Sequence, residues 1–213
     1  MNSTEEQQLE EIKEWWRENK RAVMVGVVLG LAGLFGWQAW EKQQRIHSEE
    51  ASTKYNHILS DAEEEKFEKL VSHVDELVAD YDDTPYAELA VLVAAKAAVI
   101  LDQTDVAKQR LQWAIDNARM DETRYLAQLR LARIQIVEKN YDDAGKWLAQ
   151  EYPASFLALV EEMKGDIHVG KGEIDAARVA YDKALAVPDL DQQQREIIQM
   201  KRDELGNAAE SSE

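Results

Sequence analysis

The chain contains no cysteine, which excludes disulfide bonds, thiolate metal sites and cysteine nucleophiles. Its four histidines, His47, His57, His73 and His168, are scattered, and no two of them have the spacing of a metal-binding motif. The motifs GxSxG and GxGxxG and the complete P-loop are also absent. The sequence therefore predicts no catalytic residues, no metal site and no cofactor, and we expect a protein that is not an enzyme.

Basic residues are scarce relative to acidic ones. The chain has 25 lysines and arginines against 42 aspartates and glutamates, which gives a formal net charge of -17. An excess of negative charge keeps a protein soluble and repels the phosphate groups of nucleic acids. We therefore expect no nucleic-acid partner.

Proline is also rare, and its positions are informative. Pro85, Pro153 and Pro188 each lie between segments with apolar residues at helical spacing, and none interrupts such a segment. No segment alternates polar and apolar residues between two turn signals, as a half-buried strand would. The sequence therefore predicts an all-α fold.

One long uncharged run stands out, from Ala22 to Trp40. A helix of these nineteen residues is about 28 Å long, close to the thickness of the hydrocarbon core of a bilayer. A buried helix of a soluble domain would normally keep a polar stripe, which this segment lacks. The run is also longer than the apolar region of a cleaved signal peptide and ends in Trp37 and Trp40, not in small residues. Residues 22–40 are therefore predicted to be a transmembrane signal anchor.

The orientation of this anchor follows from its flanks. Basic residues are slightly more numerous before the span (Lys13, Arg17, Lys20, Arg21) than after it (Lys42, Arg45, Lys54). This bias favours a cytoplasmic N-terminus. We expect residues 1–21 to be a cytoplasmic tail with a short amphipathic helix, and the rest of the chain to lie on the opposite side of the membrane.

Small residues recur on one face of the predicted span. Gly26, Gly30 and Gly33 are separated by four and three residues, and Gly26 with Gly30 forms a GxxxG motif. Such a face allows a second transmembrane helix to approach closely. Alternatively, these glycines reflect only the general frequency of glycine in membrane helices.

The rest of the chain divides into four predicted segments. Residues 41–84 form a helical stalk with a degenerate first helix pair, and residues 85–188 form three repeats of two helices each. Residues 189–206 form a closing helix, which Asp189 and Asp191 are placed to cap and Gly206 to end. Residues 207–213 are predicted to be a disordered tail.

The three repeats are aligned on an alanine in the second helix of each pair. Ala107, Ala144 and Ala177 are separated by 37 and 33 residues. A small residue precedes each by twelve positions, and a bulky residue follows each by four; these are Ala95, Ala132 and Gly165, and then Leu111, Leu148 and Tyr181. This pattern resembles the tetratricopeptide repeat, whose period is about 34 residues and whose paired helices interlock at such positions.

The resemblance to peptide-binding tetratricopeptide domains implies a groove lined by the first helix of each repeat. The groove positions would be Leu89, Leu92, Lys96, Val99, Leu126, Leu129, Arg133, Ile136, Leu159, Glu162, Asp166 and Val169. Such a lining suits extended or partly unfolded polypeptide. Alternatively, the stalk and the helix after it cover many of these leucines.

The whole layout resembles the ancillary SecYEG translocon subunits, the YfgM-like proteins of proteobacteria. The matching stretches are Trp15–Trp40, Leu129–Ala144, Lys164–Leu185 and Gln199–Leu205. The resemblance implies a single-pass protein of the bacterial inner membrane, with a cytoplasmic N-terminus and a periplasmic repeat domain. It also implies association with the SecYEG translocon and with PpiD, a membrane-anchored periplasmic chaperone, during the handover of emerging secretory proteins. The alternative hypothesis is a membrane-anchored scaffold for another cell-envelope assembly.

Overall fold

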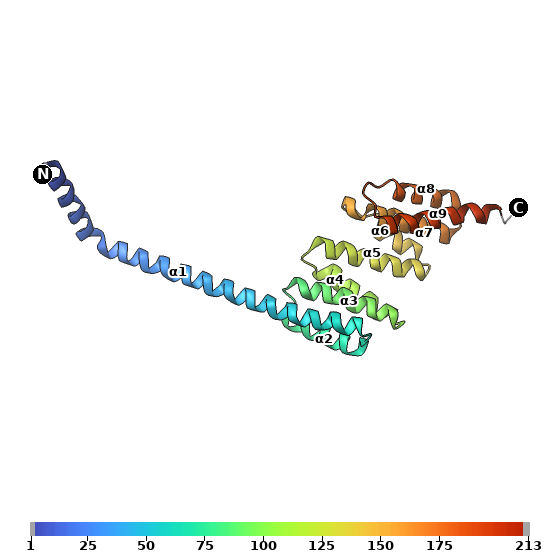
Figure 1. Ribbon diagram of the computed structural model, residues 1–213, viewed down its shortest axis with the longest axis horizontal. Helices are drawn as coiled ribbons and strands as arrows, with labels where there is room; N and C mark the ends of the chain where they lie inside the picture. Colours follow the sequence, from blue (N-terminus) through green and yellow to red (C-terminus); the bar gives the residue numbers. More distant parts are fainter. Residues whose placement is uncertain (1–2, 211–213) are drawn as a thin grey trace. The chain divides into compact units, whose positions relative to one another are not determined.

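The computed structural model describes the backbone of residues 3–210 and the side chains of residues 8–206. Within these residues the chain forms α-helices, one short 3₁₀ turn at Ala154–Phe156 and no strand, so the predicted all-α fold is confirmed (Figure 1). The helices are α1 (Ser3–Glu63), α2 (Phe67–Tyr81), α3 (Pro85–Ile100), α4 (Thr104–Asn117), α5 (Asp121–Val137), α6 (Tyr141–Leu148), α7 (Leu157–Lys171), α8 (Ile174–Leu185) and α9 (Gln192–Glu210).

The chain divides into two units, residues 1–50 and residues 51–213. The described part of the first unit is the N-terminal portion of α1. Its apolar side chains, including Leu29, Phe35 and Trp37, are exposed in the isolated chain, and no other described helix is long and apolar enough to cross a membrane. Because exposed apolar surface of this extent is stable only in an apolar surrounding, α1 fits a membrane anchor.

The predicted short helix of the tail is not a separate element. Helix α1 runs without interruption from Ser3 through the apolar run to Glu63. The physical reason is the absence of helix-breaking residues, since no glycine or proline occurs before Gly26. The segment boundaries at residues 21 and 40 therefore remain predictions that depend on a membrane.

In the second unit, each helix from α2 to α9 packs against the next one along the chain. Helix α3 also contacts α5, and α5 contacts α7. The first helices of successive pairs therefore lie beside one another, as in a stack of helical hairpins. The pairs α3–α4, α5–α6 and α7–α8 correspond to the three repeats predicted between residues 85 and 188.

A left-handed residue ends the first helix of each pair. Glu65, Asp102, Lys139 and Gly172 have positive φ angles of 55°, 60°, 63° and 78°. In each case the following amide donates to a carbonyl five residues earlier; the pairs are Lys66 to Asp61, Gln103 to Ala98, Asn140 to Gln135 and Glu173 to His168, all at 2.8 Å. These bonds satisfy carbonyls at the helix end. The end of α1 and α2 share this turn, which supports the degenerate first helix pair predicted within residues 41–84.

The small and bulky residues of each repeat meet as the pattern predicts. Gly165 lies against Tyr181, and a β-carbon at Gly165 would overlap the tyrosine ring. The Tyr181 hydroxyl donates a hydrogen bond of 2.8 Å to Asp166 Oδ1. Burial raises the pKa of Tyr181, and the carboxylate of Asp166 raises it further. In the first repeat, Ala95 and Leu111 belong to one hydrophobic cluster.

The closing helix α9 packs on α8 and covers the end of the stack. Asp191 caps it as predicted, because its Oδ1 accepts a hydrogen bond of 2.9 Å from the amide of Gln194. Gly206 does not end the helix, which continues to Glu210. A single glycine weakens a helix by only about 1 kcal/mol. Of the tail predicted to be disordered, residues 207–210 are helical, and residues 211–213 lie outside the described residues.

Candidate partner-binding groove

The predicted groove corresponds to the face formed by α3, α5 and α7, because α3 contacts α5 and α5 contacts α7. Four of the predicted groove residues, Lys96, Val99, Arg133 and Val169, are exposed on it. Five others are partly buried: Leu89, Leu126, Ile136, Leu159 and Asp166. The remaining three, Leu92, Leu129 and Glu162, are buried.

The structure corrects the prediction for two of the leucines. Leu92 belongs to the hydrophobic cluster that also holds Leu77 and Leu111, and Leu129 packs in a second cluster with Leu148. Both leucines therefore stabilise the stack and are not available to a partner. A heptad-like spacing along a first helix places some positions against the second helix of the same pair, which the sequence pattern did not distinguish.

In the third repeat, a side chain of the closing helix reaches two of the predicted groove residues. Lys201 of α9 donates hydrogen bonds of 2.7 Å to Glu162 Oε1 and 2.8 Å to both carboxylate oxygens of Asp166. The carboxylate of Glu162 is almost fully buried, so it requires this cation. Both carboxylates are therefore already engaged within the chain, and contact of Glu162 and Asp166 with a partner stays a prediction.

An open cavity lies between α3, α4 and α5, with a volume of about 490 Å³. Its lining residues are Ala95, Lys96, Val99, Thr104, Leu111, Arg130, Arg133, Ile134, Val137 and Glu138. Three of them, Lys96, Val99 and Arg133, are predicted groove residues. The cavity therefore contains three of the predicted residues of the first two repeats and none of those of the third.

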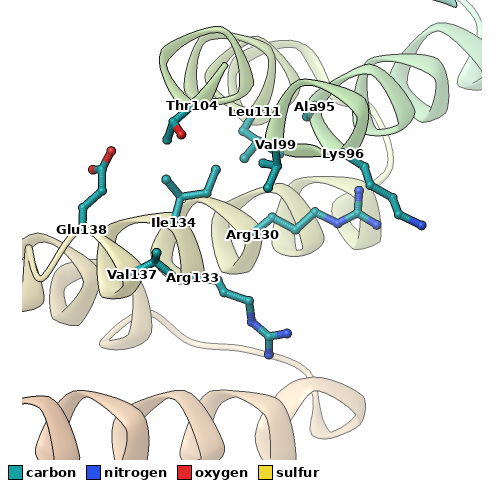
Figure 2. A pocket seen from close by; sticks show the side chains of 10 residues that line it. All are labelled: Ala95, Lys96, Val99, Thr104, Leu111, Arg130, Arg133, Ile134, Val137 and Glu138. Atoms are coloured by element: carbon teal, nitrogen blue, oxygen red, sulfur yellow. The ribbon is translucent and has the colours of Figure 1, made fainter. Parts of the chain in front are cut away.

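The two ends of the cavity differ in charge. Figure 2 shows the cationic groups of Lys96 and Arg130 toward one side, and Thr104 with Glu138 toward the other, while the side chain of Arg133 extends away from both groups. The side chains of Val99, Leu111 and Ile134 lie between the two ends (Figure 2). The cavity can thus offer apolar contact in its middle and positive charge at one end.

Arg130 joins two of the helices that form the cavity. Its Nη1 donates a hydrogen bond of 2.9 Å to the carbonyl oxygen of Leu92, which ties α5 to α3. Partial burial lowers the pKa of Arg130, but an arginine guanidinium stays protonated at any physiological pH. A fixed positive charge therefore lies at the cavity wall.

Seven lining residues were not among the predicted groove positions, and three of these are on α5: Arg130, Ile134 and Val137, with Glu138 directly after the helix. The predicted set on this helix is offset from the observed one by about one residue. Helical side chains tilt toward the N-terminus, so a given surface position is covered by a residue about one place further along. Applying this tilt to the positions predicted from Leu129 and Arg133 would have indicated Arg130 and Ile134.

The predicted glycine face of the span is unobstructed. No described atom lies within 4 Å of a β-carbon built on Gly26, Gly30 or Gly33, apart from the helix itself and the neighbouring residues. A second helix therefore has room to approach this face closely. Contact with a partner helix at these glycines stays a prediction.

Comparison with known proteins identifies the family of this chain. A family model described as "Tetratricopeptide repeat-like domain" matches residues 13–207. The chain belongs to this family. The match covers the anchor segment as well as the repeats, and it agrees with the interlocking helix pairs described above.

Similar proteins from several bacteria are named "Ancillary SecYEG translocon subunit". The protein from Escherichia coli (strain K12) is 29% identical over 92% of this chain and 94% of its own length. The relative from Haemophilus influenzae is 29% identical over 84% of this chain and 88% of its own length. The relative from Neisseria gonorrhoeae is 26% identical over 94% of this chain and 97% of its own length. These matches confirm the resemblance noted in the sequence, and no solved structure matches the chain.

Proposed function

We propose that this protein is a non-enzymatic accessory subunit of the Sec translocon. The observation that carries the proposal is the similarity over nearly the whole chain, anchor included, to proteins named as ancillary SecYEG translocon subunits. The exposed apolar length of α1 and the repeat domain after it supply the two parts that such a role needs, an anchor and a recognition surface.

The anchor is proposed to dock as well as to tether. In this arrangement α1 crosses the bacterial inner membrane once, with the N-terminus cytoplasmic and the repeat domain periplasmic. The open glycine face at Gly26, Gly30 and Gly33 would contact a membrane helix of SecYEG. The repeat domain is then held near the point where secretory proteins emerge.

The open part of the groove is proposed to bind polypeptide. Its partner is an emerging secretory protein or a PpiD-like membrane-anchored periplasmic chaperone, and the protein helps to pass clients from the translocon to such chaperones. Exposed apolar residues such as Val99 and Val137, beside the cations of the cavity, support a role in recognition.

Site-specific photo-crosslinking in cells tests the docking of the anchor. A crosslinker at Gly30 should react with SecYEG, whereas one at Val28 lies on the opposite side of the helix and should react mainly with lipid. If neither position ever reaches the translocon, the proposal is wrong.

Affinity purification in mild detergent provides an independent test. SecYEG and a periplasmic chaperone should be recovered with the protein and identified by mass spectrometry. Consistent recovery of a different envelope assembly in place of the translocon would instead support the scaffold hypothesis.

A further inference from the structure

We propose that the cavity between α3 and α5 selects extended polypeptide segments in which an acidic side chain lies next to apolar ones. The inference rests on the proposed function for its setting, since that function supplies the polypeptide, and it adds a chemical preference to the groove.

Two cations at one end of the cavity lack carboxylate partners. Within residues 8–206, no carboxylate lies within ion-pair distance of Lys96 or Arg130. The third lining cation, Arg133, is paired with Glu162 at 4.0 Å. In a chain with 42 acidic and 25 basic residues, two neighbouring cations without a carboxylate partner favour an external anion.

The opposite end does not repel an acidic ligand strongly. Glu138 is paired with Lys108, whose Nζ lies 2.6 Å from its Oε1. The negative charge at this end is therefore compensated within the protein, while the positive charge at the other end is not. The net field of the cavity favours an anionic group beside Lys96 and Arg130.

The middle of the cavity requires an apolar ligand. Val99 and Val137 are 49% and 78% exposed, and they flank Ile134 at the cavity wall. A small hydrophilic anion would leave these side chains in water, whereas an apolar side chain would cover them. The ligand therefore combines an acidic group with apolar groups.

The location of the cavity favours polypeptide over a compact molecule. Helix α5, which forms one wall of the cavity, also contacts α7, and partly buried apolar residues such as Ile136 and Leu159 lie on these two helices. An extended chain can place one acidic side chain at the cations and further apolar side chains along this face.

Binding of matched peptides to the full chain in phosphatidylcholine nanodiscs tests the inference. The probe is Gly-Ser-Ile-Leu-Asp-Ile-Leu-Ser-Gly with a zwitterionic fluorophore, and its partner has Asn in place of Asp. Fluorescence anisotropy should give an affinity about tenfold higher for the Asp peptide, since a charge-assisted hydrogen bond replaces a neutral one. A third peptide with Ser at the four apolar positions should bind weakly.

Variants then assign the preference to the cavity. Lys96→Gln and Arg130→Gln should each reduce the Asp-over-Asn preference by about two- to fivefold, the range of a partly exposed ion pair. Lys96→Arg should retain most of the preference, which excludes a folding defect at this position. Val137→Ser should lower the affinity for both peptides to a similar extent. Arg178→Gln, an exposed arginine on α8, is the matched control and should leave both affinities unchanged.

Three results would overturn the inference. One is equal affinity of the unmodified protein for the Asp and Asn peptides, and another is an unchanged preference in Lys96→Gln. The third is binding of lysophosphatidylglycerol, followed by native mass spectrometry and lost in Lys96→Gln, without any peptide preference; that result assigns the cavity to an anionic lipid. SecYEG recovery is measured on the unmodified protein and on the same variants. Equal peptide affinities of the unmodified protein with normal recovery refute the cavity inference alone, and absent recovery with a normal peptide preference refutes the accessory-subunit proposal alone.

Discussion

Lys201 joins the closing helix to the first helix of the third repeat through Glu162 and Asp166. It compensates Glu162, which is buried, and Asp166, which also accepts from Tyr181. Nothing in the sequence pairs these residues, because Lys201 follows Glu162 by 39 positions. The contact explains why both carboxylates are already engaged within the chain.

Replacing Lys201 with glutamine should lower the free energy of unfolding by about 2 to 3 kcal/mol, because a buried carboxylate loses its cation. Urea unfolding followed by circular dichroism measures the change. Lys183→Gln, an exposed lysine on α8, is the control and should cost less than about 0.5 kcal/mol. Equal effects of the two changes would show that the Lys201 contact contributes little.

Glu88 has a comparable role between repeats. It is buried, and its carboxylate accepts hydrogen bonds of 2.7 Å from the amide of Arg119 and 3.4 Å from the amide of Met120, just before α5 begins. Glu88→Ala should therefore destabilise the domain by about 2 kcal/mol, since these amides lose a charged acceptor. The exposed Glu68 offers the control change Glu68→Ala, whose effect in the same unfolding measurement should be a few tenths of that size.

A substitution at one of the left-handed turns is predicted to stabilise the domain, in contrast to the two destabilising changes above. Lys139 has a φ of 63°, is exposed, and lies at the position that Gly172 takes in the third repeat. Lys139→Gly should raise the free energy of unfolding by about 1 kcal/mol, because glycine adopts this conformation without a steric cost. Lys139→Ala keeps the β-carbon and should give no such gain; a gain of equal size from alanine would contradict the explanation.

Among the helices, α9 has the clearest structural task, since it covers the apolar end of the stack. Ile198 is fully buried on it, together with Tyr181 and Ala184 of α8, whereas the adjacent Ile197 is 40% exposed. The sequence predicted a closing helix here, and the structure shows which of its sides is buried.

The two neighbouring isoleucines allow a matched comparison. Ile198→Ala should destabilise the domain by about 3 kcal/mol through the cavity it leaves, and Ile197→Ala by less than about 1 kcal/mol. Thermal unfolding of both variants measures the difference. Similar losses for the two would mean that α9 does not pack in the orientation described.

For the molecule as a whole, the open question of mechanism is whether the anchor docks or only tethers. Replacing Gly26, Gly30 and Gly33 together with leucine should leave membrane insertion intact, because leucine is at least as apolar. It should reduce SecYEG recovery at least several-fold, since close helix approach is blocked. The control replaces Val28 and Ala32 with leucine on the opposite side. Unchanged recovery from the glycine variant would reduce the span to an anchor.

Much of the fold could be predicted from the sequence because the controlling terms are local. The apolar run from Ala22 to Trp40 is expected to partition into a bilayer because of its composition alone. Helix existence follows from spacing and from the absence of strand signals, and the repeat phase follows from pairs such as Gly165 and Tyr181. Each of these properties depends mainly on residues that are close together in the sequence.

The candidate site was only partly predictable, because its composition depends on distances between helices. The sequence could not show that Leu92 and Leu129 face the core, that α5 presents Arg130 and Ile134 to the cavity, or that Lys201 binds Glu162. Small rotations of a helix decide which neighbouring residue faces a cavity, and packing against other helices sets those rotations. Composition and periodicity thus determined the anchor and the repeats, while three-dimensional packing determined which charges remain unpaired and available to a partner.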